Sequence, residues 1–201
     1  MLSPRLQQHE SQRGTTMLEV LVTIVILAFG MLGLAGLQSK IFSAEMESYQ
    51  RGQAVVLLNS MIERITANRT VAASYVLAAG TTLGTGDSQP ATCPATAATP
   101  AALVAKDQCE WSNALKGAAE TSGTTKVGGM IGALGCVTQI QAEDATAGLC
   151  KPGIYLISVA WQGLNATSTP PVTCGQGSFG ADERLRRVLS ARVSVGLPAC
   201  Q

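Results

Sequence analysis

Glu19 stands at the entrance to an apolar run, residues 20–39, that contains no charged side chain. A helix of about twenty apolar residues is long enough to cross the hydrocarbon core of a bilayer. A carboxylate is unfavourable by about 2.5–3.5 kcal/mol at the centre of such a helix and by less near its end. Because a plain anchor gains nothing from this charge, we infer that Glu19 has a role other than anchoring.

The residues before the run form a short basic leader, residues 1–14, which ends at Gly14. Arg5 and Arg13 lie in this leader, so we expect it to stay in the cytoplasm and the rest of the chain to face outward. A cleavable secretory signal has an apolar core of about 7–15 residues. The run here is longer, which disfavours that alternative, and a plain single-pass anchor leaves Glu19 unexplained.

The order of residues 14–19, Gly-Thr-Thr-Met-Leu-Glu, followed by the apolar run, resembles the type IV pilin-like family. In that family an aspartyl prepilin peptidase cuts after the glycine and N-methylates the new first residue. The resemblance implies cleavage between Gly14 and Thr15, N-methylation of Thr15, and identity of Glu19 with the family's glutamate. The first mature residue of the family is often Phe, whereas here it is Thr.

The spacing of Thr15 and Glu19 gives this resemblance a physical meaning. The two residues are i and i+4 on a helix, so the new amino terminus and the carboxylate share one face. A negative side chain in the first turns also suits the positive end of the helix dipole. We hypothesise that Glu19 pairs with the amino terminus of a neighbouring subunit, which would draw a subunit from lipid into a filament in one register only.

The composition disfavours an enzyme. The only histidine, His9, lies in the leader, so the mature chain has no imidazole for a Ser-His or Cys-His pair or for a metal. Glu143 and Asp144 are adjacent in a polar stretch that is typical of a solvated loop. Loss of the leader leaves 12 basic and 12 acidic side chains, so nothing indicates a nucleic-acid partner. We expect no cofactor, no metal and no small-molecule substrate.

Six cysteines follow the apolar run, and none forms a CxxC motif; they are Cys93, Cys109, Cys136, Cys150, Cys174 and Cys200. An even number beyond an export segment predicts disulfides in an oxidising compartment. Fifteen connectivities are possible for six cysteines. The simplest hypothesis pairs sequence neighbours: 93 with 109, 136 with 150, and 174 with 200.

The chain divides into four parts by pattern: the leader 1–14, a membrane or filament-core helix 15–39, an amphipathic helix 40–68, and a disulfide-stabilised periplasmic head 69–201. One helix is predicted from Thr15 to about Asn68. Within it an apolar stripe recurs at helical spacing, formed by Ala54, Leu58, Met61 and Ile65, with Phe42, Met46 and Tyr49 extending it upstream.

The head is predicted to be a small antiparallel sheet that covers the helix stripe. Strand patterns occur near residues 136–141, 154–161 and 188–195. Residues 78–105 resemble a long loop, a short helix is expected at 107–119, and 162–181 is a connecting excursion. Arg184, Arg186 and Arg187 are interpreted as a solvated strand entrance, with a basic contact patch as the alternative. These patterns predict an α+β fold, and the resemblance implies that it is pilin-like.

A narrower resemblance is to the PilV-type pilus modification proteins. The blocks that carry it are 18–22, 30–38, 135–137, 152–155, 157–164, 174–175 and 186–188. It implies a minor pilin of the inner membrane and of the assembled pilus or its tip, acting in pilus priming, twitching motility and adhesion. Its partners would be the prepilin peptidase, other minor pilins, the major pilin, and the inner membrane through residues 20–39. The alternatives are a minor pseudopilin of a type II secretion system, a membrane-tethered periplasmic enzyme or binding module, and an adhesin or DNA-capturing tip.

Overall fold

The computed structural model describes Gly14 and residues 16–117, 121–122, 125–126, 130, 132–146 and 148–197. It forms two compact units, Met1–Ala44 and Glu45–Gln201, which we describe separately. Helix α1, Met17–Ala67, contributes its first part to the first unit and its remainder to the second. Its bounds confirm the long predicted helix to within two residues at each end.

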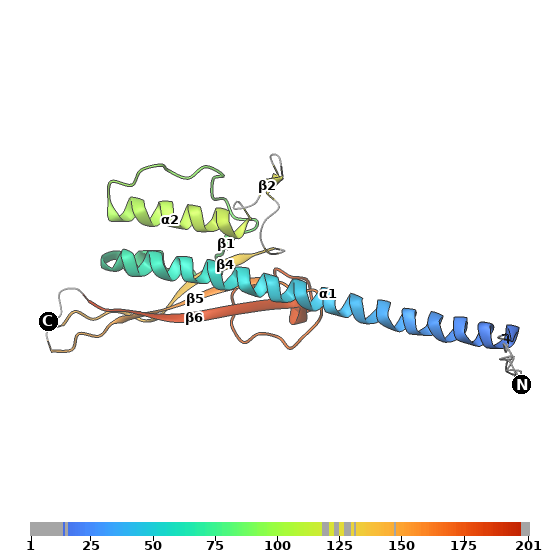
Figure 1. Ribbon diagram of the computed structural model, residues 1–201. Coiled ribbons are helices and arrows are strands. Elements are labelled where there is room, and N and C mark those ends of the chain that lie inside the picture. The colour runs from blue at the N-terminus through green and yellow to red at the C-terminus, as the bar shows by residue number, and fades with distance from the viewer. Residues whose placement is uncertain are drawn as a thin grey trace, which may run out of the picture. The chain divides into compact units, whose positions relative to one another are not determined.

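The second unit holds a four-stranded antiparallel sheet in the order β1-β4-β5-β6 (Figure 1). Its strands are β1 (Leu83–Gly84), β4 (Leu134–Gln141), β5 (Gly153–Gln162) and β6 (Arg186–Val195). A separate two-stranded hairpin pairs β2 (Thr121–Ser122) with β3 (Thr125–Lys126). The remaining elements are η1 (Arg69–Tyr75), helix α2 (Pro100–Leu115) and η2 (Glu183–Leu185). The α+β, pilin-like fold is thus confirmed.

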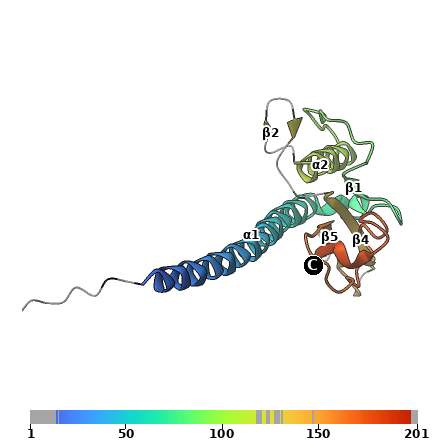
Figure 2. The same ribbon diagram turned by 90° about the vertical axis from the view of Figure 1, so that its right-hand side faces the viewer.

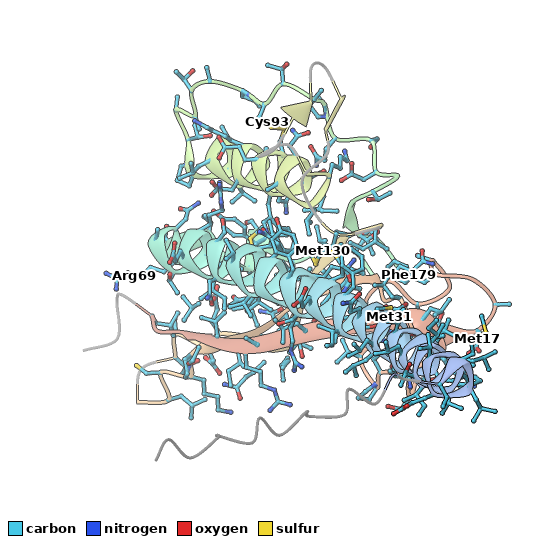
Figure 3. All side chains as sticks on the ribbon, turned by 45° about the vertical axis from the view of Figure 1, so that its right-hand side comes forward. Met17, Met31, Arg69, Cys93, Met130 and Phe179 are labelled. Carbon is cyan, nitrogen blue, oxygen red and sulfur yellow. A yellow bond between two sulfur atoms is a disulfide. The ribbon has the colours of Figure 1, made fainter. Side chains whose placement is uncertain are left out.

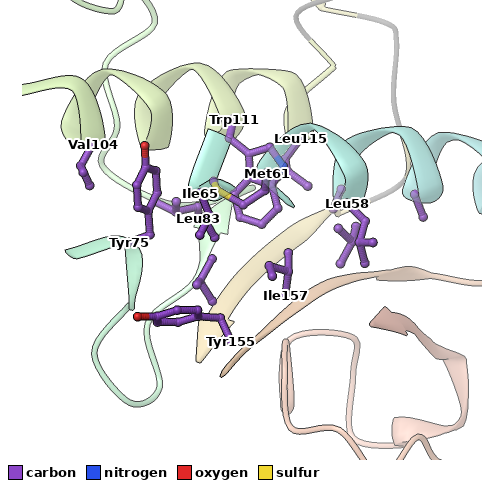
Figure 4. Close-up of a cluster of buried hydrophobic side chains, with 14 of the residues drawn as sticks. Leu58, Met61, Ile65, Tyr75, Leu83, Val104, Trp111, Leu115, Tyr155 and Ile157 are labelled. Atoms are coloured by element: carbon purple, nitrogen blue, oxygen red, sulfur yellow. The ribbon is translucent and has the colours of Figure 1, made fainter. Parts of the chain in front are cut away.

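The second half of α1 lies between α2 and the sheet (Figure 2). Four α1 side chains are 0–5% exposed and form the predicted stripe: Ala54, Leu58, Met61 and Ile65. They pack against the inward face of β5, where Tyr155, Ile157 and Val159 are fully buried, and against Trp111 and Leu115 of α2 (Figure 4). The helix repeats every 3.6 residues and the strand every 2, so each has one apolar face, and these two faces form one core.

The upstream extension of the stripe is wrong for this unit. Met46 and Tyr49 are exposed, and the buried residue one turn before Ala54 is Gln50. Its side-chain oxygen has no hydrogen-bond partner among the described residues. A search for apolar residues at helical spacing does not find Gln50, because its side chain is polar although it lies on the buried face.

Helix α2 begins seven residues earlier than predicted. Thr99 is its N-cap and accepts a hydrogen bond from the Ala102 N–H at 3.2 Å, and Pro100 occupies the first helical position. A proline there loses nothing, because the first N–H groups of a helix have no intrahelical partner. The loop predicted for residues 78–105 therefore ends before Pro100, and Thr followed by Pro is itself a helix-start signal.

The structure corrects two of the three predicted cysteine pairs. Cys93 and Cys109 are bonded as predicted, whereas Cys136 is bonded to Cys174, 38 residues away. Cys136 lies on β4 and Cys174 on the excursion that folds over the outer face of the sheet, where both join one apolar cluster with Phe179. The pairing thus follows spatial proximity and not sequence order. Cys150 also takes part in a disulfide.

Candidate assembly site on the N-terminal helix

Thr16 caps the start of α1. The Glu19 N–H donates to the Thr16 carbonyl oxygen at 3.0 Å and lies 3.4 Å from its hydroxyl oxygen, and the Val20 N–H donates to the same carbonyl at 3.3 Å. Thr16 is therefore the N-cap of α1, and Thr-x-x-Glu is the sequence of a capping box, of which the described residues form the Thr16 half. The sequence reasoning missed this role, although the spacing Thr-x-x-Glu signals it.

The Glu19 carboxylate is exposed and makes no ion pair or side-chain hydrogen bond with any described residue. Near it, Gly14 is described and exposed, whereas Thr15 lies outside the described residues. Among its described residues, the first unit thus presents a carboxylate without a partner, close to the predicted cleavage position. The backbone N–H groups of the first turn favour a negative charge there. Of the six cysteines, Cys200 also lies outside the described residues.

The first part of α1 presents apolar side chains in all directions, as the sticks around Met17 and Met31 show (Figure 3). Large apolar residues from Met17 to Phe42 are between 44% and 93% exposed. One 18-residue window has a mean hydropathy of 2.6, and none of that window is buried. The helix is therefore long and apolar enough to cross a membrane. A helix that is apolar all round must be covered by lipid or by other helices.

In the second unit, α1 is fastened to the sheet by an ion pair near the start of β6. Glu47 Oε1 lies 3.2 Å from Arg187 Nη2 and accepts a hydrogen bond from the Asn165 N–H at 3.2 Å. Arg187 also donates to the Thr167 hydroxyl at 2.7 Å. This clamp joins α1 to two segments that lie 118 and 140 residues further along the chain.

Arg186 corrects the interpretation of the arginine cluster as a solvated strand entrance. Its side chain is 2% exposed, forms an ion pair with Glu183, and donates to the carbonyl oxygen of Cys174 at 3.0 Å and to that of Pro170 at 3.2 Å. A hydrogen bond from the Gly177 N–H, together with Arg186, lowers the pKa of Glu183 below its ordinary value. The hydrogen bonds of the buried Arg186 guanidinium thus hold the connecting excursion in place around it.

Among the described residues, no three His, Cys, Asp or Glu side chains are grouped so that they could hold a metal ion. The features that stand out in the described part of the chain are the exposed apolar helix with its capped start and the Glu47–Arg187 clamp of the head.

A comparison with protein-family models matches residues 36–125 to the Tt1218-like family, described as type IV pilin Tt1218. The matched region includes most of α1, η1, β1 and α2. This match covers 90 of the 201 residues and supports a type IV pilin-like family for the chain. No curated protein and no solved structure matches it.

Pilins are structural proteins, and the similarity to this family supports a role of the chain in pilus-type assembly together with other pilins. The apolar helix and the family together indicate membrane anchoring and association with a pilus.

Proposed function

We propose that this pilin is a minor pilin that takes part in the priming and assembly of a type IV pilus, after cleavage between Gly14 and Thr15 and N-methylation of Thr15. The observation that carries the proposal is the first part of α1, which is apolar on every side and has the unpartnered carboxylate of Glu19 in its first turn. Before assembly, lipid covers this surface. In the filament, the helices of other subunits replace the lipid.

Glu19 sets the register of that exchange in the proposed mechanism. Cleavage after Gly14 would create an amino terminus four residues before Glu19 in the chain, so neighbouring subunits would each carry one positive and one negative group near the helix start. In an apolar bundle, opposite charges attract strongly and an unpaired charge is costly. Only the register that brings a carboxylate to a neighbouring amino terminus removes that cost.

The proposed partners follow from this mechanism and from the resemblance to PilV-type proteins. They are the prepilin peptidase, the other minor pilins, the major pilin and the inner membrane, which residues 20–39 would cross. The head would be periplasmic and would reach the surface with the assembled pilus. The disulfides support an oxidising compartment, because they are rare in the cytosol.

Mass spectrometry of the N-terminal peptide from native membranes and sheared pili tests the processing step. We expect a terminus at N-methylated Thr15, which is lost in a strain without the prepilin peptidase. Retention of Met1, or a cut beyond Ser39, would show that the run is a plain anchor or a secretory signal, and the role of Glu19 would fall with it.

Two substitutions test the charge of Glu19. Glu19→Gln removes the charge and keeps the size of the side chain, and the Thr16 cap, which bonds to the backbone N–H of residue 19, is retained. We expect Glu19→Gln and Glu19→Ala to insert into the membrane normally and to be depleted from sheared filaments by about tenfold. Glu45→Gln, a matched change on an exposed part of the same helix, should incorporate normally. Normal incorporation of Glu19→Gln would contradict the pairing mechanism.

A minor pseudopilin of a type II secretion system would use the same helix surface. Deletion of the gene separates the two functions. Loss of twitching with intact exoprotein secretion supports the pilus, and the reverse outcome assigns the protein to the secretion system.

A further inference from the structure

We propose that the free edge of β6 is a docking site for an extended strand from another pilin subunit, and that this strand carries an acidic residue among apolar ones. The identity of the partner as a pilin rests on the proposed function, whereas the site itself does not. It combines three features of the second unit: an unpaired strand edge, an incompletely covered core beneath it, and a hollow beside it.

The edge is long and regular. β6 is the last strand of the sheet, and its ten residues pair with β5 without a bulge (Figure 1). No described residue makes a backbone–backbone hydrogen bond to residues 188–195 from the other side. Edge strands usually carry prolines or bulges, or are short, because an open edge pairs readily with another chain. β6 has no proline and no bulge.

The hydrogen bonds of the sheet show which backbone groups of β6 are free. The Leu77 N–H donates to the Val137 carbonyl at 3.0 Å, so the backbone of Val137 points away from β5. Val137 lies opposite Ile157, and Ile157 lies opposite Ala191. The backbone N–H and C=O groups of successive residues point to opposite sides of an antiparallel strand. Ile157 therefore points to β6 and forms backbone hydrogen bonds with Ala191, whereas the N–H and C=O of Ser190 point to the free edge. The same alternation applies to residues 188, 192 and 194.

The core under β6 is open on this side. Leu189, Ala191 and Val193 point inward but are only half-buried, whereas their neighbours Tyr155 and Ile157 on β5 are fully buried. An added strand would cover these side chains and extend the core by one strand. A strand added at this edge would therefore gain apolar contacts with these three half-buried side chains in addition to backbone hydrogen bonds.

A hollow of about 320 Å³ lies between α1 and the first half of β6. It is lined by Trp161 and Leu189 at the sheet and by Ser48 and Arg51 at the helix, beside the Glu47–Arg187 clamp. Recognition of an added strand uses such hollows, since alternate side chains of the strand enter them. An apolar or acidic side chain of an incoming strand would fit a hollow that offers an indole and a guanidinium.

The charges select the occupant. Arg51 is exposed and forms no ion pair among the described residues, and Arg192 is exposed on β6 itself. β6 contains three arginines and no acidic residue. A second copy of β6 would therefore bring like charges together, which destabilises a strand pair. A strand that carries a glutamate or aspartate is instead attracted by these arginines.

A peptide titration of the full-length protein in detergent tests the site. The probe is an eight-residue peptide that alternates threonine and valine with one central glutamate, and amide exchange of β6 reports binding. We expect protection of the amides of residues 188, 190, 192 and 194. Ser190→Pro removes an outward N–H without touching the bonds to β5, so it should weaken binding about tenfold. Ser190→Ala, which keeps the N–H, should bind like the unaltered protein.

The same peptide with lysine in place of glutamate should bind about tenfold more weakly, because the lysine meets an arginine on either face: Arg51 on the helix side or Arg192 on the outer side. Absence of binding by the glutamate peptide, or equal affinity of Ser190→Pro and the unaltered protein, would overturn the proposal. Equal affinity for both peptides would overturn the acidic character of the partner. Because the titration uses no filament, its failure is distinguishable from failure of the proposed function, which appears as absence of the unaltered protein from pili.

Discussion

Arg64 Nη1 on α1 lies 2.7 Å from Asp107 Oδ1 on α2 and 2.8 Å from Glu110 Oε2 on the same helix. The second carboxylate oxygen of Asp107 accepts a hydrogen bond from the Tyr75 hydroxyl, so this side chain joins α1, η1 and α2. Burial and the hydrogen bond to Asp107 raise the pKa of Tyr75 to about 12. The head is thus held to its helix by one nearly buried carboxylate as well as by the apolar stripe.

Asp107→Ala should lower the free energy of unfolding by about 3 kcal/mol, because it leaves the buried Tyr75 hydroxyl without its acceptor and Arg64 with Glu110 alone. Urea unfolding of the full-length protein in detergent, followed by tryptophan fluorescence, measures the change. Glu110→Ala removes the other carboxylate near Arg64, but its side chain is 37% exposed and should cost less than about 1 kcal/mol. Equal effects of the two substitutions would contradict this difference.

Gly135 and Gly52 should respond to alanine in opposite directions. A Cβ at Gly135 would lie 2.3 Å from Cη2 of the buried Trp111, so Gly135→Ala should destabilise the head by about 1–3 kcal/mol. A Cβ at Gly52 meets no atom within 4 Å on an exposed part of α1, so Gly52→Ala should stabilise it by about 0.5–1 kcal/mol. Thermal unfolding by circular dichroism compares both, and a stabilised Gly135→Ala would show that Trp111 moves freely.

Asp87 should make the head sensitive to acid. Burial alone would raise its pKa, but hydrogen bonds from Lys116, from the Ser112 hydroxyl at 2.6 Å, and from the N–H groups of Gly84 and Gln89 outweigh burial and hold the pKa below its ordinary value. A depressed folded-state pKa contributes stability above about pH 4 that is lost as the pH falls through the folded value. Asp87→Asn should be less stable at neutral pH and lose less on acidification. A parallel decline in both proteins, measured by urea unfolding between neutral and acidic pH, argues against this role.

The Cys136–Cys174 disulfide should contribute more than the Cys93–Cys109 disulfide. The first closes a loop with a sequence separation of 38 and the second one of 16. In the chain-entropy model these loops correspond to about 4 and about 3 kcal/mol. Unfolding of the two double-serine variants measures the difference. Peptide mapping without reduction checks the connectivity, and a peptide that links residues 136 and 150 would refute the assignment made here.

The sequence alone predicted the elements whose signals are local. The apolar run after Gly14, the stripe from Ala54 to Ile65 and the alternation of residues 188–195 each repeat with the period of the backbone they belong to. These periods specify which side chains share a face, so the helix, the strands and their buried sides could be predicted. The early start of α2 could also have been predicted, because Thr99 and Pro100 are adjacent in the chain.

The tertiary structure decided what depends on distant segments meeting. Cys136 bonds to Cys174 because the excursion folds over β4, and Arg186 is buried because the same excursion surrounds it with carbonyl oxygens. The free edge of β6 likewise follows from strand order, which no single strand pattern contains. Periodicity is a property of neighbours in the chain, whereas pairing, burial of charge and open edges depend on which remote parts of the chain come together.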